Sequence, residues 1–141
     1  MRTGHVGINV TNLDRSIAFY REVFQLSVLR ESREGARRFG FLGDGDALVI
    51  TLWEQSTGRP NHGQPGLHHL SFQVAAREDV ESAEKRVRAL KAHIYYDGLV
   101  PHAEGAASGG IFFDDPDGNR LEIFAPTGME AEKAPASAAP T

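Results

Sequence analysis

Residues 5–24 read HVGINVTNLDRSIAFYREVF and contain the pattern that decides the fold. From His5 to Val10, branched apolar residues alternate with polar or small ones, which predicts a half-buried strand. Thr11 or Asn12 then offers a side-chain oxygen that caps free backbone N–H groups at a helix start. From Leu13 to Phe24, apolar residues recur at spacings of four, three and four, so the segment has one apolar helix face.

The same order of signals returns at residues 69–74, which read HLSFQV. Apolar and polar residues alternate again, and residues 80–90 repeat the helical spacing of apolar side chains. His5 and His69 therefore occupy the same slot, the first residue of the first strand of each half. The chain contains an internal repeat of structural order, although the two halves are not closely identical.

Further strands are expected in both halves, separated by the glycine- and proline-rich loop at 55–66. They are predicted at 27–31, 38–42 and 47–53 in the first half, and at 94–100, 110–113 and 119–124 in the second. Each half reads β-α-β-β-β, which makes the fold class α+β. Neither half is large enough to bury its helix and sheet alone. We therefore expect modules at 4–54 and 67–126 to pair within one domain spanning residues 1–126.

The end of the chain has a different composition. Residues 127–141, TGMEAEKAPASAAPT, are rich in alanine, proline and serine, and Met129 is their only large apolar residue. Such a segment buries too little surface to offset the entropy of ordering it. The sequence predicts a disordered tail from residue 127.

Composition excludes several classes of partner and site. The net charge of −4 argues against nucleic-acid binding. No stretch approaches the roughly 20 apolar residues of a membrane span, and no signal-peptide pattern is present, so we expect a cytoplasmic protein without a membrane partner. The sequence has no cysteine, so any metal must bind through His, Asp or Glu.

Strand parity brings three of those residues together as metal-ligand candidates. His5 and His69 lie on the strand face opposite the apolar side chains, which are expected to pack on the helices. Glu122 takes the same parity, because its neighbours Leu121 and Ile123 are the apolar residues of the last strand. Two imidazoles and one carboxylate form a facial triad that leaves coordination positions open, as a catalytic metal site requires.

Two stretches resemble a known family. Residues 4–26, GHVGINVTNLDRSIAFYREVFQL, and residues 115–124, DPDGNRLEIF, resemble the opening and closing segments of the vicinal oxygen chelate superfamily. The resemblance implies paired βαβββ modules that form a curved, barrel-like mixed sheet around a metal cavity. It implies metal ligands at His5, His69 and Glu122, a small-molecule substrate, and a homodimer in which modules are sometimes exchanged between chains. By parity, His69 is favoured over His68 as the ligand.

The type of reaction depends on a fourth carboxylate. Glyoxalase-like members of that superfamily carry a glutamate on the fourth strand, where this chain has Thr51. Glu54 has the opposite parity and reaches the site only if a bulge intervenes. The sequence therefore favours a dioxygenase-type enzyme with Fe²⁺ or Mn²⁺, although Zn²⁺ and Ni²⁺ also suit these ligands. Two alternatives stay open: a glyoxalase-like lyase or isomerase, and a metal-free protein that sequesters a drug.

Other residues are candidates for catalysis and substrate binding. His102 and Tyr96 are predicted as acid–base groups, because imidazole and phenol groups beside open metal positions serve that role. The predicted substrate-binding residues are polar or aromatic side chains of cavity-facing parity: Asn9, Ser71, Gln73, Trp53, Phe112 and Arg120. Phe39 and Phe41 join Trp53 either in an aromatic wall of the cavity or in core and dimer contacts.

Overall fold

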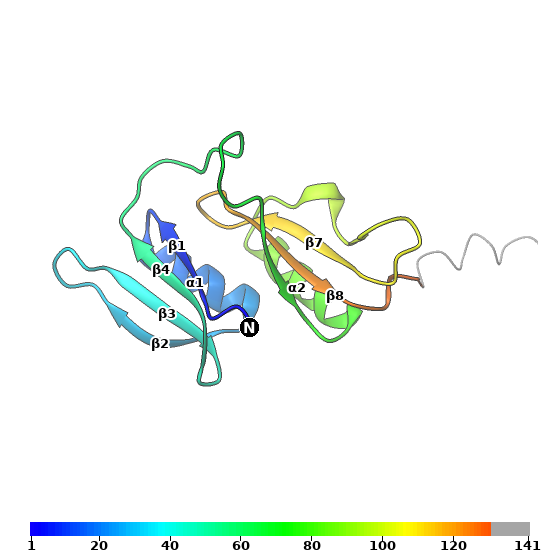
Figure 1. Ribbon diagram of the computed structural model, residues 1–141, viewed down its shortest axis with the longest axis horizontal. Coiled ribbons are helices and arrows are strands. Elements are labelled where there is room, and N and C mark those ends of the chain that lie inside the picture. Colours follow the sequence, from blue (N-terminus) through cyan, green and yellow to red (C-terminus); the bar gives the residue numbers. More distant parts are fainter. Residues whose placement is uncertain (131–141) are drawn as a thin grey trace, which may run out of the picture. The chain divides into compact units, whose positions relative to one another are not determined.

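The computed structural model describes residues 1–130, which form two compact units (Figure 1). The first unit contains Met1–Asn61 together with Asp115–Gly118. The second begins at His62, runs to Asp114 and resumes at Asn119.

The first unit is a four-stranded mixed sheet with one helix. Its elements in chain order are β1 (Val6–Val10), α1 (Leu13–Phe24), β2 (Ser27–Ser32), β3 (Phe39–Asp44) and β4 (Ala47–Glu54). The strands are ordered β1-β4-β3-β2, and β1 is parallel to β4 while the other pairs are antiparallel. Helix α1 packs on one face of β3 and β4 (Figure 1).

The second unit repeats this topology. Its elements are β5 (Leu70–Gln73), α2 (Arg77–Ala89), the 3₁₀ helix η1 (Tyr95–Asp97), β6 (Val100–Pro101), β7 (Gly109–Asp114) and β8 (Arg120–Ala125). The strand order is β5-β8-β7-β6, again with the first strand parallel to the last. Helix α2 packs on β7 and β8 (Figure 1). The predicted α+β class with paired βαβββ modules is therefore confirmed.

Helix α1 forms where the sequence predicts it, and its apolar face is buried. The Asn12 side chain accepts a hydrogen bond from Arg15 N–H and caps the helix. Leu13 and Tyr20 are fully buried against the sheet. Close approach is allowed by Gly40 of β3, because a Cβ atom there would lie only 2.8 Å from Cδ1 of Ile17. Each large apolar side chain buried in this way contributes about 1.5–3 kcal/mol.

The second unit has its own apolar core, which extends beyond the last strand. Val80 and Val87 of α2 and Phe113 of β7 are fully buried, as is nearly all of Met129. Met129 N–H also donates to the carbonyl of Ala107. Residues 127–130 are thus part of the second unit, whereas the sequence assigned them to the tail. The rest of the predicted tail, residues 131–141, lies outside the described residues.

Four residues from far along the chain complete the first unit. Asp117 accepts hydrogen bonds from Thr11 N–H and from the Thr11 hydroxyl, and Arg15 Nη2 lies 2.9 Å from its carboxylate. The buried Tyr20 hydroxyl donates to Oδ2 of Asp115 at 2.7 Å. The acidic turn of the closing motif therefore fixes the start and middle of α1.

The strand predicted at 94–100 is wrong for most of its length. Ile94 makes one isolated β-bridge with Phe113, but Tyr95–Asp97 form η1 and only Val100 and Pro101 continue as strand β6. Tyr96, Asp97 and Gly98 all have positive φ angles, which an extended strand does not allow. Alternating hydrophobicity gave no warning of this turn, because aromatic residues are common in strands.

Among residues 1–130, neither helix is both long and apolar enough to cross a membrane.

Candidate active site

The sheet face of the second unit that points away from α2 carries a group of polar and aromatic side chains. Ser71 of β5 pairs in register with Glu122 of β8, which pairs in turn with Phe112 of β7. The alternate residues Leu121 and Ile123 are buried on the helix side. Residues predicted as metal ligand and substrate contacts therefore share one face, as strand parity predicted.

Glu122 is the centre of this group. The residue is buried, with only 4% of its surface exposed. The Ser71 hydroxyl donates to Oε1 at 2.7 Å, and His69 Nε2 lies 3.6 Å from the same oxygen. His102 Nε2 lies 2.6 Å from the other oxygen, Oε2. A buried carboxylate thus faces two imidazole nitrogens within one unit.

His102 is held at the start of the hairpin that joins β6 to β7. Its N–H donates to the carbonyl of Ser108, and its Nδ1 lies 2.8 Å from the Ser108 hydroxyl. Its ring also lies against Phe124, with 5.2 Å between ring centroids. Ser108 was not among the predicted site residues. Ser108 could be found only from the pairing of the two ends of the hairpin, and the periodicity of the sequence does not show that pairing.

His69 immediately precedes β5, just as His5 immediately precedes β1. The Nδ1 atom of His69 lies 2.8 Å from Nδ1 of His68, so its Nε2 is the nitrogen that faces Glu122. The His69 ring lies 5.7 Å from that of Phe112. The neighbouring histidine and Phe112 thus hold the ring in place.

An aromatic and cationic group lies further along the same face. The Arg120 guanidinium carbon is 4.7 Å from the centroid of the Tyr95 ring, and the Tyr95 hydroxyl donates to Oδ1 of Asp114 at 2.7 Å. Burial, followed by this hydrogen bond, raises the pKa of Tyr95. Among the described residues, Arg120 Nε is buried without a hydrogen-bond partner. The Tyr96 ring lies 5.8 Å from that of Phe112.

Three predicted residues lie in the first unit, on or beside the sheet face away from α1. His5 is exposed just before β1, and Asn9 Oδ1 accepts a hydrogen bond from Gln55 Nε2 at 3.0 Å. Trp53 Nε1 donates to the Thr51 hydroxyl at 2.9 Å.

The Trp53 ring also belongs to an aromatic cluster. The ring centroids of Phe39 and Phe41 lie 5.4 and 5.7 Å from that of Trp53.

Glu54, the residue considered as a fourth ligand, is engaged elsewhere. Its Oε2 accepts a hydrogen bond from Leu13 N–H at 2.7 Å, and its Oε1 lies 2.6 Å from Arg38 Nε. The Leu13 hydrogen bond and then Arg38 lower the pKa of Glu54. One carboxylate oxygen of Glu54 therefore accepts from the first residue of α1, and the other pairs with Arg38, which immediately precedes β3.

The predicted ligands are divided between the two units. His5 lies in the first, whereas His69 and Glu122 lie in the second. Within residues 1–130, no group of three or more His, Asp or Glu side chains is arranged to hold a metal ion. The structure therefore brings His69 close to Glu122, and all three ligand assignments stay predictions.

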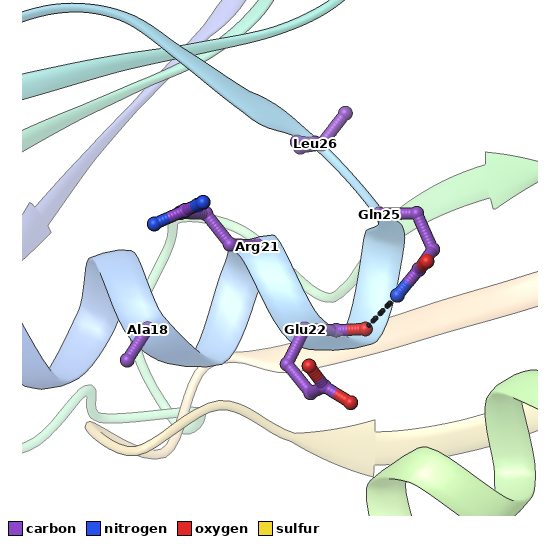
Figure 2. A pocket seen from close by; sticks show the side chains of 5 residues that line it. All are labelled: Ala18, Arg21, Glu22, Gln25 and Leu26. Carbon is purple, nitrogen blue, oxygen red and sulfur yellow. Dashed lines mark hydrogen bonds between the residues drawn. The ribbon is translucent and has the colours of Figure 1, made fainter.

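An open depression on the outer face of α1 contains none of the predicted site residues. Figure 2 shows its lining, in which the Gln25 side chain donates to the carbonyl of Glu22 at 2.7 Å. The other lining residues are Ala18, Arg21 and Leu26. No arrangement of acid–base or metal-binding groups in this depression suggests chemistry.

Comparison with known families identifies the fold. A family model described as the Glyoxalase/Bleomycin resistance protein/Dioxygenase superfamily matches residues 2–123. The chain belongs to this superfamily. The resemblance noted from the two sequence stretches is thereby confirmed.

Relatives within the superfamily differ in their named reactions. The chain is 32% identical over 124 residues to a trivalent organoarsenical cleaving enzyme of a Bacillus species, covering 88% of this chain and 73% of that protein. It is 26% identical over 124 residues to catechol-2,3-dioxygenase of Bacillus subtilis, covering 86% of this chain. That match spans only 40% of the dioxygenase, so the chain covers less than half of that relative's length.

A solved structure of the superfamily shares the fold. The fosfomycin resistance protein FosX of Listeria monocytogenes superposes with a TM-score of 0.69 at 20% identity, over 94% of this chain and 97% of FosX. That FosX structure is a mutant complexed with Mn(II) and 1S,2S-dihydroxypropylphosphonic acid. At this identity the likeness establishes the fold alone.

Proposed function

We propose that the protein is a metal-dependent enzyme that acts on a small molecule bound through two vicinal oxygens, with dioxygenase chemistry. The observation that supports this most is the buried Glu122 carboxylate with His69 Nε2 at 3.6 Å from its Oε1. Imidazole nitrogen and carboxylate oxygen suit Fe²⁺ or Mn²⁺, and also Zn²⁺ and Ni²⁺. The donor set therefore fits a divalent metal.

We assign three metal ligands: His69 and Glu122 of the second unit, and His5 of the first. His5 is included because it precedes β1 as His69 precedes β5, and because it matches the ligand position of the superfamily that the sequence resembles. When bound, the metal acts as a Lewis acid and as a template for the two substrate oxygens. Two histidines and one carboxylate leave positions open for them.

The chain's own residues then orient the substrate and move protons. Phe112, which pairs with Glu122 across the strands, and Tyr96 beside Phe112 offer aromatic rings, and Arg120 stands two residues, or about 7 Å of strand, from Glu122. Ser71 donates to Glu122, while Gln73 continues the same face of β5. Asn9 and Trp53 are the proposed contacts from the first unit.

Two residues were predicted for proton transfer, and their surroundings differ. Both ring nitrogens of His102 have hydrogen-bond partners, Ser108 and Glu122. The Tyr96 side chain is exposed, and its ring lies beside Phe112. Tyr96 is therefore the better placed of the two to reach a substrate hydroxyl.

The absence of cysteine bears on the substrate. Trivalent arsenic is a soft centre, and soft centres prefer thiolate ligands. The sequence has no cysteine with which to bind it. We therefore favour an organic substrate with vicinal oxygens, such as a catechol, over the substrate of the organoarsenical cleaving relative.

A lyase or isomerase of the glyoxalase kind is less well supported. That reaction would need a further carboxylate at the metal, and Glu54 has both oxygens engaged with Leu13 and Arg38. Dioxygenase chemistry adds both atoms of O₂ to the substrate and needs no external reductant. The stoichiometry of the reaction therefore requires no co-reactant other than the substrate and O₂.

Three measurements test the proposed function. Protein loaded with Fe²⁺ without oxygen should consume O₂ when a catechol is added, and this uptake should be absent in Glu122→Ala. Isomerase activity under anaerobic conditions, without O₂ uptake, would instead support the lyase. Protein that retains no metal after incubation with Fe²⁺, Mn²⁺, Zn²⁺ and Ni²⁺ would favour a metal-free drug-binding protein.

We also propose a homodimer, which light scattering of the purified chain would test. The cytoplasmic location expected from the sequence stays a prediction.

A further inference from the structure

We propose that His102 is a positioning residue, which holds the Glu122 carboxylate so that only one of its oxygens is offered to the metal. This inference rests on the proposed function, because it concerns the same carboxylate. It changes the role predicted for His102 from proton transfer to orientation of a ligand.

The hydrogen-bond partners fix which nitrogen of His102 carries the proton. An ionised carboxylate only accepts hydrogen bonds, so His102 Nε2, at 2.6 Å from Glu122 Oε2, must be the donor. In the neutral ring Nδ1 is then an acceptor, and the Ser108 hydroxyl at 2.8 Å donates to it. The backbone hydrogen bond from His102 N–H to Ser108 O holds the two residues opposite each other.

The two oxygens of Glu122 consequently have different surroundings. Oε2 accepts the hydrogen bond from His102, whereas Oε1, which accepts one from Ser71, is the oxygen that faces His69 Nε2, at 3.6 Å. Two ligand atoms bound about 2.1 Å from one metal lie roughly 3 Å or more apart, which the His69–Oε1 distance satisfies. The Ser71 hydroxyl at 2.7 Å further orients Oε1. Glu122 is therefore prepared to bind through Oε1 alone, which leaves one more coordination position for substrate.

A role in proton transfer is harder to reconcile with this geometry. Both nitrogens of His102 are engaged, and its ring is packed against Phe124 with 5.2 Å between centroids. To exchange a proton with a substrate, the ring would have to leave Glu122. Hydrogen-bonding partners of this kind commonly fix metal ligands, and their loss typically weakens metal binding by about 10–100-fold.

Three variants of the full chain separate the two roles. His102→Ala removes the donor, whereas His102→Gln keeps an amide N–H donor but cannot transfer a proton at neutral pH. His93→Ala is the control, because His93 is exposed and its ring contacts Tyr95 instead of Glu122. Mn²⁺ affinity is measured by calorimetry, and the visible spectrum of the Co²⁺ form reports the coordination.

We expect His102→Ala to bind Mn²⁺ about 10–100-fold more weakly and to change the Co²⁺ spectrum. His102→Gln should recover most of the affinity and the turnover, and His93→Ala should match the parent protein. The proposal is overturned if His102→Ala binds Mn²⁺ like the parent, with the same Co²⁺ spectrum, but both His102 variants lose turnover. That result would make His102 a proton-transfer group.

A measurement without metal tests the hydrogen bonds themselves. Nitrogen NMR of metal-free protein should find the His102 ring protonated at Nε2 and bare at Nδ1, and the opposite tautomer would contradict the proposal. Failure of the proposed function has a different signature, since the parent protein would then bind neither Mn²⁺ nor Co²⁺.

Discussion

The Glu54 carboxylate accepts a hydrogen bond from the backbone N–H of Leu13 at 2.7 Å, although 41 residues separate them. Leu13 is the first residue of α1, where backbone N–H groups lack partners within the helix. A negative charge at this end also interacts favourably with the helix dipole. Glu54 therefore joins the end of β4 to the start of α1, and its role is structural.

The contribution of Glu54 to the stability of the fold should decrease as the pH is lowered into the acid range. The Leu13 hydrogen bond and Arg38 lower its pKa from the ordinary 4.5, so the folded state favours the charged form. Its contribution is complete above about pH 4.5 and is lost as the pH falls through the lowered pKa. Thermal melts should place Glu54→Gln below the parent at pH 7, with the gap narrowing in acid. The exposed Glu34→Gln is the control, and a gap independent of pH would contradict the assignment.

Tyr20 should contribute stability through its buried hydroxyl. Tyr20→Phe removes a buried hydrogen bond to the Asp115 carboxylate, and a hydrogen bond to a charged group contributes about 1.5–3 kcal/mol, which is the loss expected in chemical denaturation. Burial and the nearby Asp115 raise the pKa of Tyr20 well above 10.0. The neutral form is thus favoured in the folded state, and its stabilisation is complete below pH 10 and lost above it. Tyr20→Phe should therefore unfold less steeply in alkali than the parent, and equal alkaline sensitivity would argue against this role.

Strand parity and the repeat made much of this arrangement predictable. Alternation in β5 and β8 placed Ser71 and Glu122 on one face, because a strand has only two faces to which side chains point. The repeated slot singled out His5 and His69, which both immediately precede the first strand of their unit. These features follow from local periodicity and so can be read from one sequence.

Other features depend on turns and long-range contacts, which have no periodic signature. The hydrogen bond between His102 and Glu122 forms only if the hairpin between β6 and β7 has its observed length. It also requires that Ser108 lie opposite His102. The left-handed conformation of Tyr96 breaks an expected strand and brings its ring to Phe112. Such positions are set by tertiary packing, which overrides strand propensity.

The acidic turn before β8, which contains Asp115 and Asp117, should contribute to the stability of the fold. Asp117 is 5% exposed and accepts hydrogen bonds from Thr11 and Arg15. Asp117→Ala would remove these bonds and should lower the free energy of unfolding by about 3 kcal/mol. Urea denaturation measures this loss. Asp46→Ala, in the exposed turn between β3 and β4, should change stability by less than about 0.5 kcal/mol. A similar loss in both variants would show that the contacts of Asp117 contribute little.

Arg120 should select for substrates that carry a negative charge. Its guanidinium is held over the Tyr95 ring on the face of Glu122, and its buried Nε lacks a partner among the described residues. A charge-assisted hydrogen bond to a carboxylate contributes about 1.5–3 kcal/mol, which corresponds to roughly 10–100-fold in affinity. Arg120→Met keeps an apolar stem without the charge. It should raise KM for a carboxylated catechol at least about tenfold, while KM for catechol itself changes little.

The control for Arg120 is Lys85→Met, which removes a positive charge from the exposed surface of α2. It should leave both KM values unchanged, because Lys85 lies on the helix and not on the sheet face of Glu122. If Arg120→Met raised KM equally for charged and neutral catechols, Arg120 would be acting on the shape of the site through Tyr95 and not on substrate charge. Oxygen uptake with the two substrates therefore separates charge recognition from packing at this position.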